Sequence, residues 1–352
     1  GKRQIMTKIN WQNTNYLVVV GFFQEKEDEK MESPKPYLFT DNNPYSMEDY
    51  AQSIRRLEKP KGRIDVVLDS DMFNEVDDQF ALAYLLQSEE KMRLRAVFAA
   101  PFYNHHSEDA KDGMEKSYEE IFRILKLLKR ESYCDSVYKG SDSFLSDEKT
   151  PVESEAVDRL IEMAKDYSAQ NPLYVIAIAA CTNIASALIK CPELKEKLFV
   201  VWLGGMGFDW HDNKSFNAGQ DVAAARVLLG SGVPLVLIPG KGVAEKFTTT
   251  GPELDYWLKD KNEFCDYIVE KTVREAGICN GNKCWSRPIS DVMAVAWLQD
   301  RKFMLDRLES SPVMEYDHLY AKDQRRLFIR YVYSVDRDSL MEDLFTKISQ
   351  YE

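Results

Sequence analysis

Five short apolar segments, five to seven residues long, alternate along the middle of the chain with segments of helical periodicity. They are rich in Val, Ile and Leu: Ile64–Leu68, Leu94–Ala99, Leu173–Ala179, Leu198–Leu203 and Pro234–Pro239. The helical segments lie near residues 77–88, 113–130, 152–168, 182–190 and 219–230. Strands that are apolar along their whole length are typical of a parallel sheet buried on both faces. The sequence therefore predicts an α/β fold: an open, mostly parallel Rossmann-like sheet with helices on both faces.

The two ends of the chain depart from this alternation. Residues 24–35 are dense in charge, and the apolar run Leu17–Phe23 before them predicts a strand, because seven residues are far fewer than the ~20 that span a bilayer. We expect residues 1–60 to form an N-terminal extension and residues 61–352 to form the domain that carries the function. After Pro239 the pattern is mostly helical to about residue 301.

A late strand and a closing helix are predicted beyond that helical portion. Leu327–Val335 has the composition of a strand, and Ser339–Gln350 has the periodicity of a helix. The predicted fold therefore ends in a largely helical C-terminal portion.

Composition narrows the classes of partner. A net charge of -12 disfavours binding to nucleic acid. The chain starts without the apolar core of a signal peptide, and no run approaches bilayer length, so we expect a cytoplasmic protein without a membrane partner. Six cysteines are too few for a disulfide scaffold, and Cys279 with Cys284 lacks the second Cys or His pair of a zinc site.

The first predicted strand runs into ten residues, 69–78, that hold five carboxylates. Acidic side chains at a helix start gain only about 0.3–1 kcal/mol each from the helix dipole, which does not offset their mutual repulsion in one pocket. A divalent cation would reverse that balance. The alternative is a solvated acidic turn in which one or two aspartates cap the helix.

Further polar residues follow the other predicted strands. Asn104 follows the second strand, Thr182 and Asn183 follow the third, and Asn217 follows the fourth. Ligands of open α/β sheets lie at the carboxyl ends of the strands, where carboxylates, amides and carbonyls suit a hard cation and a polyhydroxylated molecule. Asn183 and Asn217 each also fit the role of a helix cap, but their repetition at one sheet edge favours a site.

Two known motifs were compared with the acidic segment. An EF-hand is excluded, because Asn74 stands where that loop needs glycine and Phe80 where it needs glutamate. A haloacid-dehalogenase phosphatase explains Asp69 and Asp71 after an apolar strand, but its later partners are missing and the following Asp77-Asp78 pair has no role in it.

Four stretches, in order and at similar spacing, resemble the calcium-dependent nucleoside hydrolases. The family's motifs are Asp-x-Asp-Pro-Gly-x-Asp-Asp, Leu-Thr-Asn, Glu-Phe-Asn and His-Asp-x-x-Ala-x-Ala. Their counterparts in this chain span about residues 62 to 300 and are Asp69-Ser70-Asp71 with Asp77-Asp78, Cys181-Thr182-Asn183, Ser215-Phe216-Asn217 and Ser290-Asp291-Val292-Met293-Ala294-Val295-Ala296.

This resemblance implies an enzyme that hydrolyses the N-glycosidic bond of a ribonucleoside or related ribosyl compound with a calcium-bound water. It implies that Ca²⁺ is bound by Asp71, Asp78, Asp291 and the main-chain carbonyl of Thr182, and that Asp71 is also the general base. The ribose hydroxyls would be held by Asp77, Asn104, Asn217 and Asp291. Family members are commonly oligomers, so a homodimer or homotetramer is expected.

The chain departs from the family pattern on the side of the leaving base. Ser290 stands where the best-known branch has a histidine that contacts the base, and Ser215 replaces a glutamate near the 5′-hydroxyl. Two residues are also inserted between Asp71 and Asp77. Among four histidines, His211 is the favoured replacement acid because its loop precedes Asn217. A protein that binds nucleosides or sugars without hydrolysis is the alternative function.

Overall fold

The centre of the computed structural model is an eight-stranded sheet in the order β3-β2-β1-β4-β5-β6-β12-β9. The structure describes residues 43–351 except 282 and 300–301. Neighbouring strands run parallel except β9, which pairs antiparallel with β12. The strands of this sheet are β1 Ile64–Ser70, β2 Met92–Ala99, β3 Val137–Lys139, β4 Leu173–Ala177, β5 Leu198–Leu203, β6 Leu235–Ile238, β9 Met304–Ser310 and β12 Phe328–Val335.

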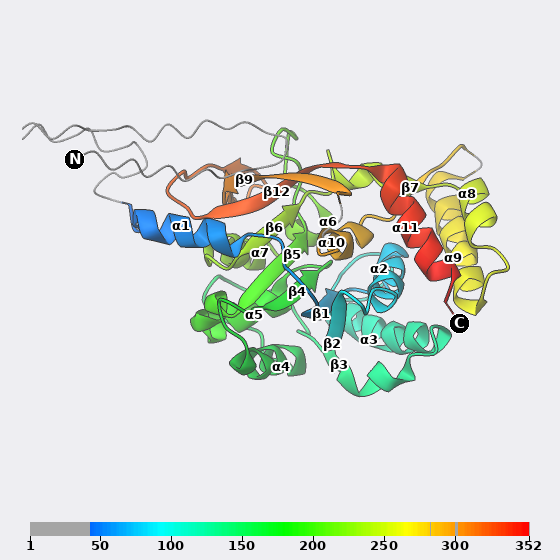
Figure 1. Cartoon of the computed structure of the whole chain (residues 1–352), viewed down its shortest axis with the longest axis horizontal. Helices are drawn as coiled ribbons and strands as arrows, with labels where there is room; N and C mark the ends of the chain where they lie inside the picture. Colours follow the sequence, from blue (N-terminus) through cyan, green and yellow to red (C-terminus); the bar gives the residue numbers. More distant parts are fainter. Residues whose placement is uncertain (1–42, 282, 300–301, 352) are drawn as a thin grey trace, which may run out of the picture.

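Helices cover both faces of the sheet (Figure 1). Buried side chains of β1 show the division, because Val66 and Leu68 belong to one core cluster and Val67 to the other. The first cluster contains residues of α2 Asp77–Leu86, α3 Ala110–Leu127, α8 Gly251–Trp257, α9 Glu263–Asn280, α10 Val292–Trp297 and α11 Arg337–Ser349. The second contains residues of α4 Glu155–Met163, α5 Thr182–Lys190, α6 Phe216–Gln220 and α7 Val222–Gly230. The predicted α/β architecture is therefore confirmed.

The direction of the chain across the sheet reverses between β1 and β4. The chain passes from β1 to β2 and β3 at one edge, then returns to place β4 on the other side of β1. A crevice at the carboxyl ends of two such strands is the usual ligand site of open α/β sheets. The reversal therefore brings together the residues that follow Ser70 and Ala177.

The five predicted strands of the middle region and the helices between them are all present. The late strand and the closing helix are also confirmed as β12 and α11. Between residues 239 and 301 the chain is mostly helical, as predicted, and β7 Thr248–Thr249 pairs antiparallel with β8 Arg287–Pro288 in a small two-stranded sheet.

The sequence analysis missed several short or exposed elements. Strand β3 has three residues, and the strands of the hairpin, β10 Val313–Met314 and β11 Tyr320–Ala321, have two each. Strand β9 was missed because its exposed edge position lets charged residues alternate with leucines, so it has no apolar run.

Part of the predicted N-terminal extension is a helix. Helix α1, Met47–Arg56, packs on the sheet through Tyr50, whose ring lies edge-on to Phe328 at a centroid distance of 5.8 Å. The Tyr50 hydroxyl also donates to the Arg325 carbonyl. The strand predicted at Leu17–Phe23 lies outside the described residues, and the division of the chain at residue 60 stays a prediction.

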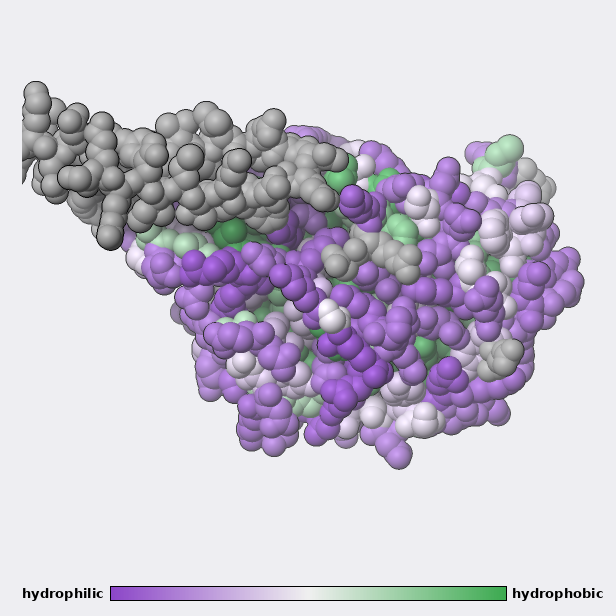
Figure 2. All heavy atoms as spheres, viewed as in Figure 1, coloured by the Kyte–Doolittle hydropathy of each residue, from purple (hydrophilic) through white to green (hydrophobic). Residues whose placement is uncertain are grey.

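The surface of the described part is mainly polar. Figure 2 shows hydrophilic residues over most of one face, with apolar residues in small separate patches. Within residues 43–351, apart from the gaps noted above, no helix combines the length and apolarity needed to cross a bilayer.

A buried ion pair connects the antiparallel strands to the rest of the fold. Arg330 of β12 donates to Asp306 of β9 at 2.6 Å, and the two side chains are 13% and 8% exposed. Asp306 also accepts from the Trp297 indole N–H at 2.9 Å. One carboxylate therefore links β9, β12 and α10.

Replacement of this carboxylate should destabilise the protein strongly. Asp306→Ala removes the charged partner of the largely buried Arg330 guanidinium, which keeps only the Leu57 carbonyl, so we expect the free energy of unfolding to fall by about 1.5–3 kcal/mol in urea denaturation. Glu309→Ala on the same strand is the control: its pair with Arg307 is exposed, and its loss should cost less than about 1 kcal/mol. Equal losses for the two variants would contradict this account.

Candidate active site

Local structure directs the aspartates of the 71–78 segment inward, whereas the Glu75 side chain is 52% exposed. The segment turns sharply after β1, with the Asn74 N–H donating to the Asp71 carbonyl at 2.7 Å. Every residue of helix α2 is buried, including Asp77 and Asp78 in its first turn. Because α2 has no solvent-facing side, its first carboxylates cannot turn toward water, and they face the crevice between β1 and β4.

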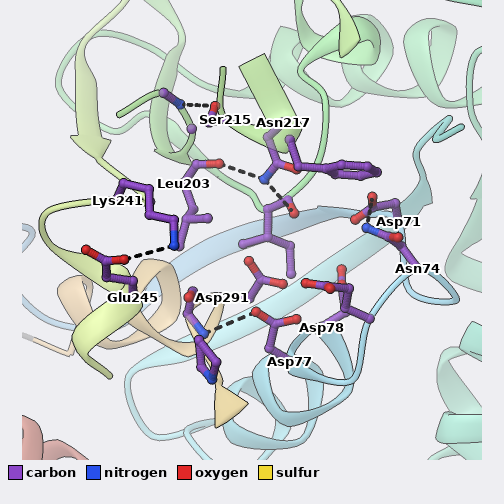
Figure 3. Close-up of a pocket in the computed structure, with 18 of the residues that line it drawn as sticks. Asp71, Asn74, Asp77, Asp78, Leu203, Ser215, Asn217, Lys241, Glu245 and Asp291 are labelled. Atoms are coloured by element: carbon purple, nitrogen blue, oxygen red, sulfur yellow. Dashed lines mark hydrogen bonds and ion pairs between the residues drawn. The ribbon is translucent and has the colours of Figure 1, made fainter. Parts of the chain in front are cut away.

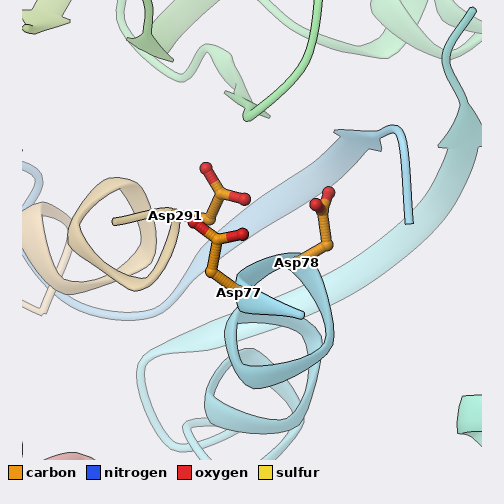
Figure 4. Close-up of side chains that lie close together, drawn as sticks. All are labelled: Asp77, Asp78 and Asp291. Carbon is orange, nitrogen blue, oxygen red and sulfur yellow. The ribbon is translucent and has the colours of Figure 1, made fainter. Parts of the chain in front are cut away.

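Three carboxylates from distant parts of the chain meet at this point. Asp77 and Asp78 come from α2, and Asp291 immediately precedes α10 (Figure 4). One oxygen of each lies within 4.8 Å of the others, and all three residues are buried. The carboxyl groups of Asp78 and Asp291 lie within hydrogen-bonding reach of each other.

Burial and mutual repulsion make these carboxyl groups weak acids. Burial, followed by the charges of neighbouring acids, raises the pKa of Asp71, Asp78 and Asp291 well above the usual range. The pKa of Asp77 is raised to about 7 by burial and by the charge of Glu75, with Arg287 opposing the shift. Four buried acids with this arrangement suit a divalent cation, which would remove both the desolvation and the repulsion costs.

Asp71 lies in the same pocket and is held by an amide. Asn74 donates from its side chain to Asp71 Oδ2 at 3.1 Å. Asn104 donates in turn to Asn74 Oδ1 at 2.6 Å. Asn104 therefore fixes Asn74, and through it Asp71, rather than lining the pocket itself.

Asn217 presents an acceptor to the pocket. Both hydrogen bonds of its amide nitrogen go to main-chain carbonyls, to Leu203 at 2.8 Å and to Ile178 at 3.2 Å. That arrangement directs the nitrogen toward the sheet and leaves Oδ1 as the acceptor for a ligand hydroxyl. Asn217 thus has a defined orientation, which a simple helix cap does not need.

These groups surround a pocket of about 250 Å³ (Figure 3). Its remaining walls include main chain at Gly204 and Gly205, where Gly205 has a φ of +72° and its N–H donates to Ser215 Oγ at 2.8 Å. A Cβ atom on Gly205 would lie 2.0 Å from the Tyr320 hydroxyl oxygen. This part of the wall is therefore restricted to glycine. The lining residues are Asp71, Asn74, Glu75, Asp77, Asp78, Ile178, Leu203, Gly204, Gly205, Met206, Ser215, Phe216, Asn217, Gly240, Lys241, Glu245, Pro288, Ser290 and Asp291.

Comparison with known sequences identifies the family. The family described as inosine-uridine preferring nucleoside hydrolase matches residues 66–341, which is most of the chain. The chain belongs to the nucleoside hydrolase family. Membership confirms the resemblance drawn from the four motifs and the class of enzyme, a hydrolase of N-glycosyl bonds. It also removes the support for a haloacid-dehalogenase phosphatase.

Individual relatives of this nucleoside hydrolase are distant. The pyrimidine-specific ribonucleoside hydrolase RihA of Klebsiella pneumoniae is 25% identical over 248 residues, covering 63% of this chain and 76% of the relative. The structure of a purine-preferring ribonucleoside hydrolase from Gardnerella vaginalis matches with a TM-score of 0.62 at 23% identity, covering 81% of this chain and 98% of that chain.

A third relative has a different description. The type III effector protein XopQ, complexed with adenosine diphosphate ribose, matches with a TM-score of 0.61 at 14% identity, covering 87% of this chain and 99% of that chain. At these identities the two structural matches establish the fold alone.

Besides Asn104, two further residues predicted from the sequence do not line the pocket of this hydrolase. Thr182 is the first residue of α5, is fully buried, and donates from its hydroxyl to Asp221 at 2.7 Å. The residue of this stretch that lines the pocket is Ile178, directly after β4. The prediction rested on the Thr-Asn motif at the start of α5. The residue that faces the crevice is Ile178, four positions earlier in the chain.

His211 is the second correction. It lies on the loop between β5 and α6, as expected, but its side chain is 77% exposed and its nearest charged partner is Asp212 at 3.4 Å. It is not among the residues that line the pocket, so it is not placed to contact a leaving base.

Sequence analysis also overlooked several residues of the pocket. Asn74 was considered only as a mismatch to the EF-hand motif. Lys241 and Glu245 follow β6, and inspection of the carboxyl end of that fifth strand would have found them by the same rule that found Asn104 and Asn217.

Removal of one charge from the cluster should stabilise the metal-free protein. Asp291→Asn keeps a hydrogen bond to Asp78 but eliminates a buried carboxylate that three neighbours repel, so we expect a gain of roughly 0.5–2 kcal/mol in thermal or urea denaturation with chelator present. With an excess of a divalent cation the order should reverse, because a bound ion would offset the repulsion in the wild type and would meet one carboxylate fewer in the variant. A variant that is less stable than wild type in chelator would contradict the repulsion argument.

Proposed function

We propose that this nucleoside hydrolase cleaves the N-glycosidic bond of a ribonucleoside or closely related ribosyl compound with the help of one Ca²⁺. The observation that carries the proposal is the meeting of Asp77, Asp78 and Asp291 within 4.8 Å in a buried pocket that also contains Asp71. An all-oxygen set of carboxylates favours a hard cation over zinc or copper.

The proposed ligands of the ion are Asp71, Asp78, Asp291 and one main-chain carbonyl. This set follows the family motif, and Asp77, which meets Asp78 and Asp291 in the structure, is assigned to the sugar. We assign that carbonyl to Ile178 instead of Thr182, because Ile178 lines the pocket. When bound, a divalent cation supplies a Lewis acid that lowers the pKa of water and polarises nearby hydroxyl groups.

The remaining side chains either accept a proton from the attacking water or bind the sugar. Asp71, oriented by Asn74, accepts the proton of the attacking water. Asp77 and the Oδ1 atom of Asn217 accept hydrogen bonds from ribose hydroxyls. The buried carboxylates stabilise the positive charge that develops on the sugar as the bond to the base breaks.

Asn104 has a different role from the one predicted by resemblance. Its amide contacts Asn74 and not the pocket, so we assign it to the support of the Asn74–Asp71 pair. The proposed sugar contacts are therefore Asp77, Asn217 and Asp291.

Hydrolysis should depend on Asp71. The substrates to test are uridine, inosine and ADP-ribose, because relatives are described with pyrimidine, purine and ADP-ribose ligands. Asp71→Asn should lower kcat by about 10²–10⁴-fold on any substrate that the wild type cleaves, measured as release of the free base. Asp65→Asn, at the opposite end of β1, should retain activity. An active Asp71→Asn enzyme would exclude the general-base role.

Calcium should bind once and be needed for turnover. Isothermal titration of chelator-treated protein is expected to show one site, which Asp78→Asn and Asp291→Asn weaken by more than about tenfold, and activity should return when Ca²⁺ is added back. Asp77→Asn should keep the ion and raise KM, since Asp77 is assigned to the sugar and already accepts from the Ser290 N–H at 3.1 Å. Full activity in chelator would contradict the metal assignment.

The binding-protein alternative has a distinct signature in the same measurements. Such a protein would bind Ca²⁺ and a nucleoside in calorimetry and release no reducing sugar. Release of sugar by the wild type excludes it.

A further inference from the structure

An ion pair stands apart from the acidic cluster in the pocket. Lys241 Nζ lies 3.0 Å from Glu245 Oε2, and both residues line the pocket. Among the described residues, Lys241 is the basic side chain in that lining, which is otherwise acidic, polar or apolar. The two side chains are 51% and 30% exposed, so the pair lies at the mouth and can contact an entering molecule.

The backbone fixes this pair in place. After β6 the chain turns at Gly242, whose φ is +91° and whose N–H donates to Glu245 Oε1 at 2.9 Å. The Glu245 N–H donates back to the Gly240 carbonyl at 3.0 Å. Partial burial raises the pKa of the Glu245 carboxyl, but the Gly242 N–H and Lys241 outweigh this effect and hold it below its usual range. Glu245 is therefore a charged, anchored partner for Lys241.

The pair lies across the pocket from the proposed base. Figure 3 shows Lys241 and Glu245 on the side opposite Asp71 and Asn74. Ser290 lies between the acidic cluster and the segment that carries the pair, because its N–H donates to Asp77 at 3.1 Å and its hydroxyl to the Ala244 carbonyl at 3.4 Å. Ser290 itself lines the pocket between the two groups.

Displacement at a sugar carbon needs different groups on opposite faces. If water approaches C1′ from the side of Asp71, the base departs on the other side and carries the electron pair of the C1′–N bond. A heterocycle that leaves in this way accumulates negative charge on its ring nitrogens and carbonyl oxygens. A hydrogen-bond donor with a positive charge stabilises that charge as it forms.

We propose that Lys241 is the leaving-group residue of this enzyme, with Glu245 as the residue that positions it. This inference rests on the proposed function. The Lys241 ammonium donates to a nitrogen or oxygen of the departing heterocycle and transfers a proton to it as the C1′–N bond breaks. Water adds hydroxide to C1′ and gives its proton to Asp71; solvent returns that proton to the lysine, so the overall reaction is nucleoside plus water to ribose plus neutral base.

A phosphate group is a less suitable occupant of this position. The Glu245 carboxylate lies 3.0 Å from the ammonium, and Asp77 and Asp291 line the same pocket, so a dianion would meet more negative than positive charge. A neutral heterocycle with both acceptor and donor atoms on one edge matches the pair.

The test compares substrates whose leaving group must be protonated with a substrate whose leaving group is a stable anion. Wild type, Lys241→Met and the control Lys246→Met are assayed with uridine, inosine and p-nitrophenyl β-D-ribofuranoside, whose nitrophenolate leaves as a stable anion. Lys246 is exposed and does not line the pocket, so its variant should behave as wild type. Lys241→Met should lower kcat on the nucleosides by about 10²-fold or more and change kcat on the nitrophenyl riboside only a few-fold.

Glu245→Gln tests the positioning role in the same assay. Gln keeps an acceptor for the Gly242 N–H but removes the charge that holds Lys241. We expect kcat on the nucleosides to fall less than in Lys241→Met, while kcat on the nitrophenyl riboside stays close to that of the wild type.

The outcomes distinguish failure of the Lys241 inference from failure of the proposed function. Unchanged nucleoside hydrolysis by Lys241→Met overturns the inference and leaves the proposed function intact. Equal losses on all three substrates also overturn it, because they assign Lys241 to the sugar or to the shape of the pocket. ADP-ribose is assayed in parallel by release of adenine; a rise in its KM alone, with normal nucleoside turnover, also overturns the inference and assigns Lys241 to phosphate. A wild type that cleaves none of these substrates overturns the proposed function together with this inference.

Discussion

Repulsion among buried carboxylates is the constraint on which the site depends. Asp71, Asp77, Asp78 and Asp291 are brought together at the carboxyl end of β1, where burial prevents water from screening them. The fold maintains this unfavourable arrangement through α2, which is buried on every side and therefore cannot rotate its first turn outward. Stability is sacrificed at this position, as is common where a protein must bind a cation or stabilise a cationic sugar.

The pocket is organised as two opposed electrostatic halves. One half contains the carboxylates with Asn74 and Asn217, and it suits positive charge on a metal or a sugar. The other half contains the Lys241–Glu245 pair, and it suits a polar heterocycle. Ser290 joins the halves by donating to Asp77 on one side and to Ala244 on the other. Such separation of charge along one axis matches a reaction in which positive charge develops on the sugar while negative charge develops on the base.

Local sequence patterns predicted the parallel sheet and the acidic residues that follow β1, whereas Asp291 was grouped with them only by the resemblance to the nucleoside hydrolases. Whole-length apolar runs identify buried strands, and the end of each run identifies the crevice. Predictions from the sequence were wrong for residues whose place in the pocket depends on the path of the chain in three dimensions. Thr182 and Ile178 are only four residues apart, yet the start of α5 takes one into the core and leaves the other in the pocket. His211 has suitable chemistry, but its loop carries it to solvent. Strand β9 was missed because an exposed edge needs no apolar run.

The main chain at Gly204 and Gly205 limits how the shape of this pocket can be changed by substitution. A side chain at Gly205 would collide with Tyr320, so the volume next to Asn217 cannot be reduced by ordinary substitution. Efforts to redirect the enzyme to other ribosyl compounds by directed evolution would therefore gain little from randomising this turn. Libraries at Met206 and Phe216, whose side chains line the same cavity, offer the adjustable surface.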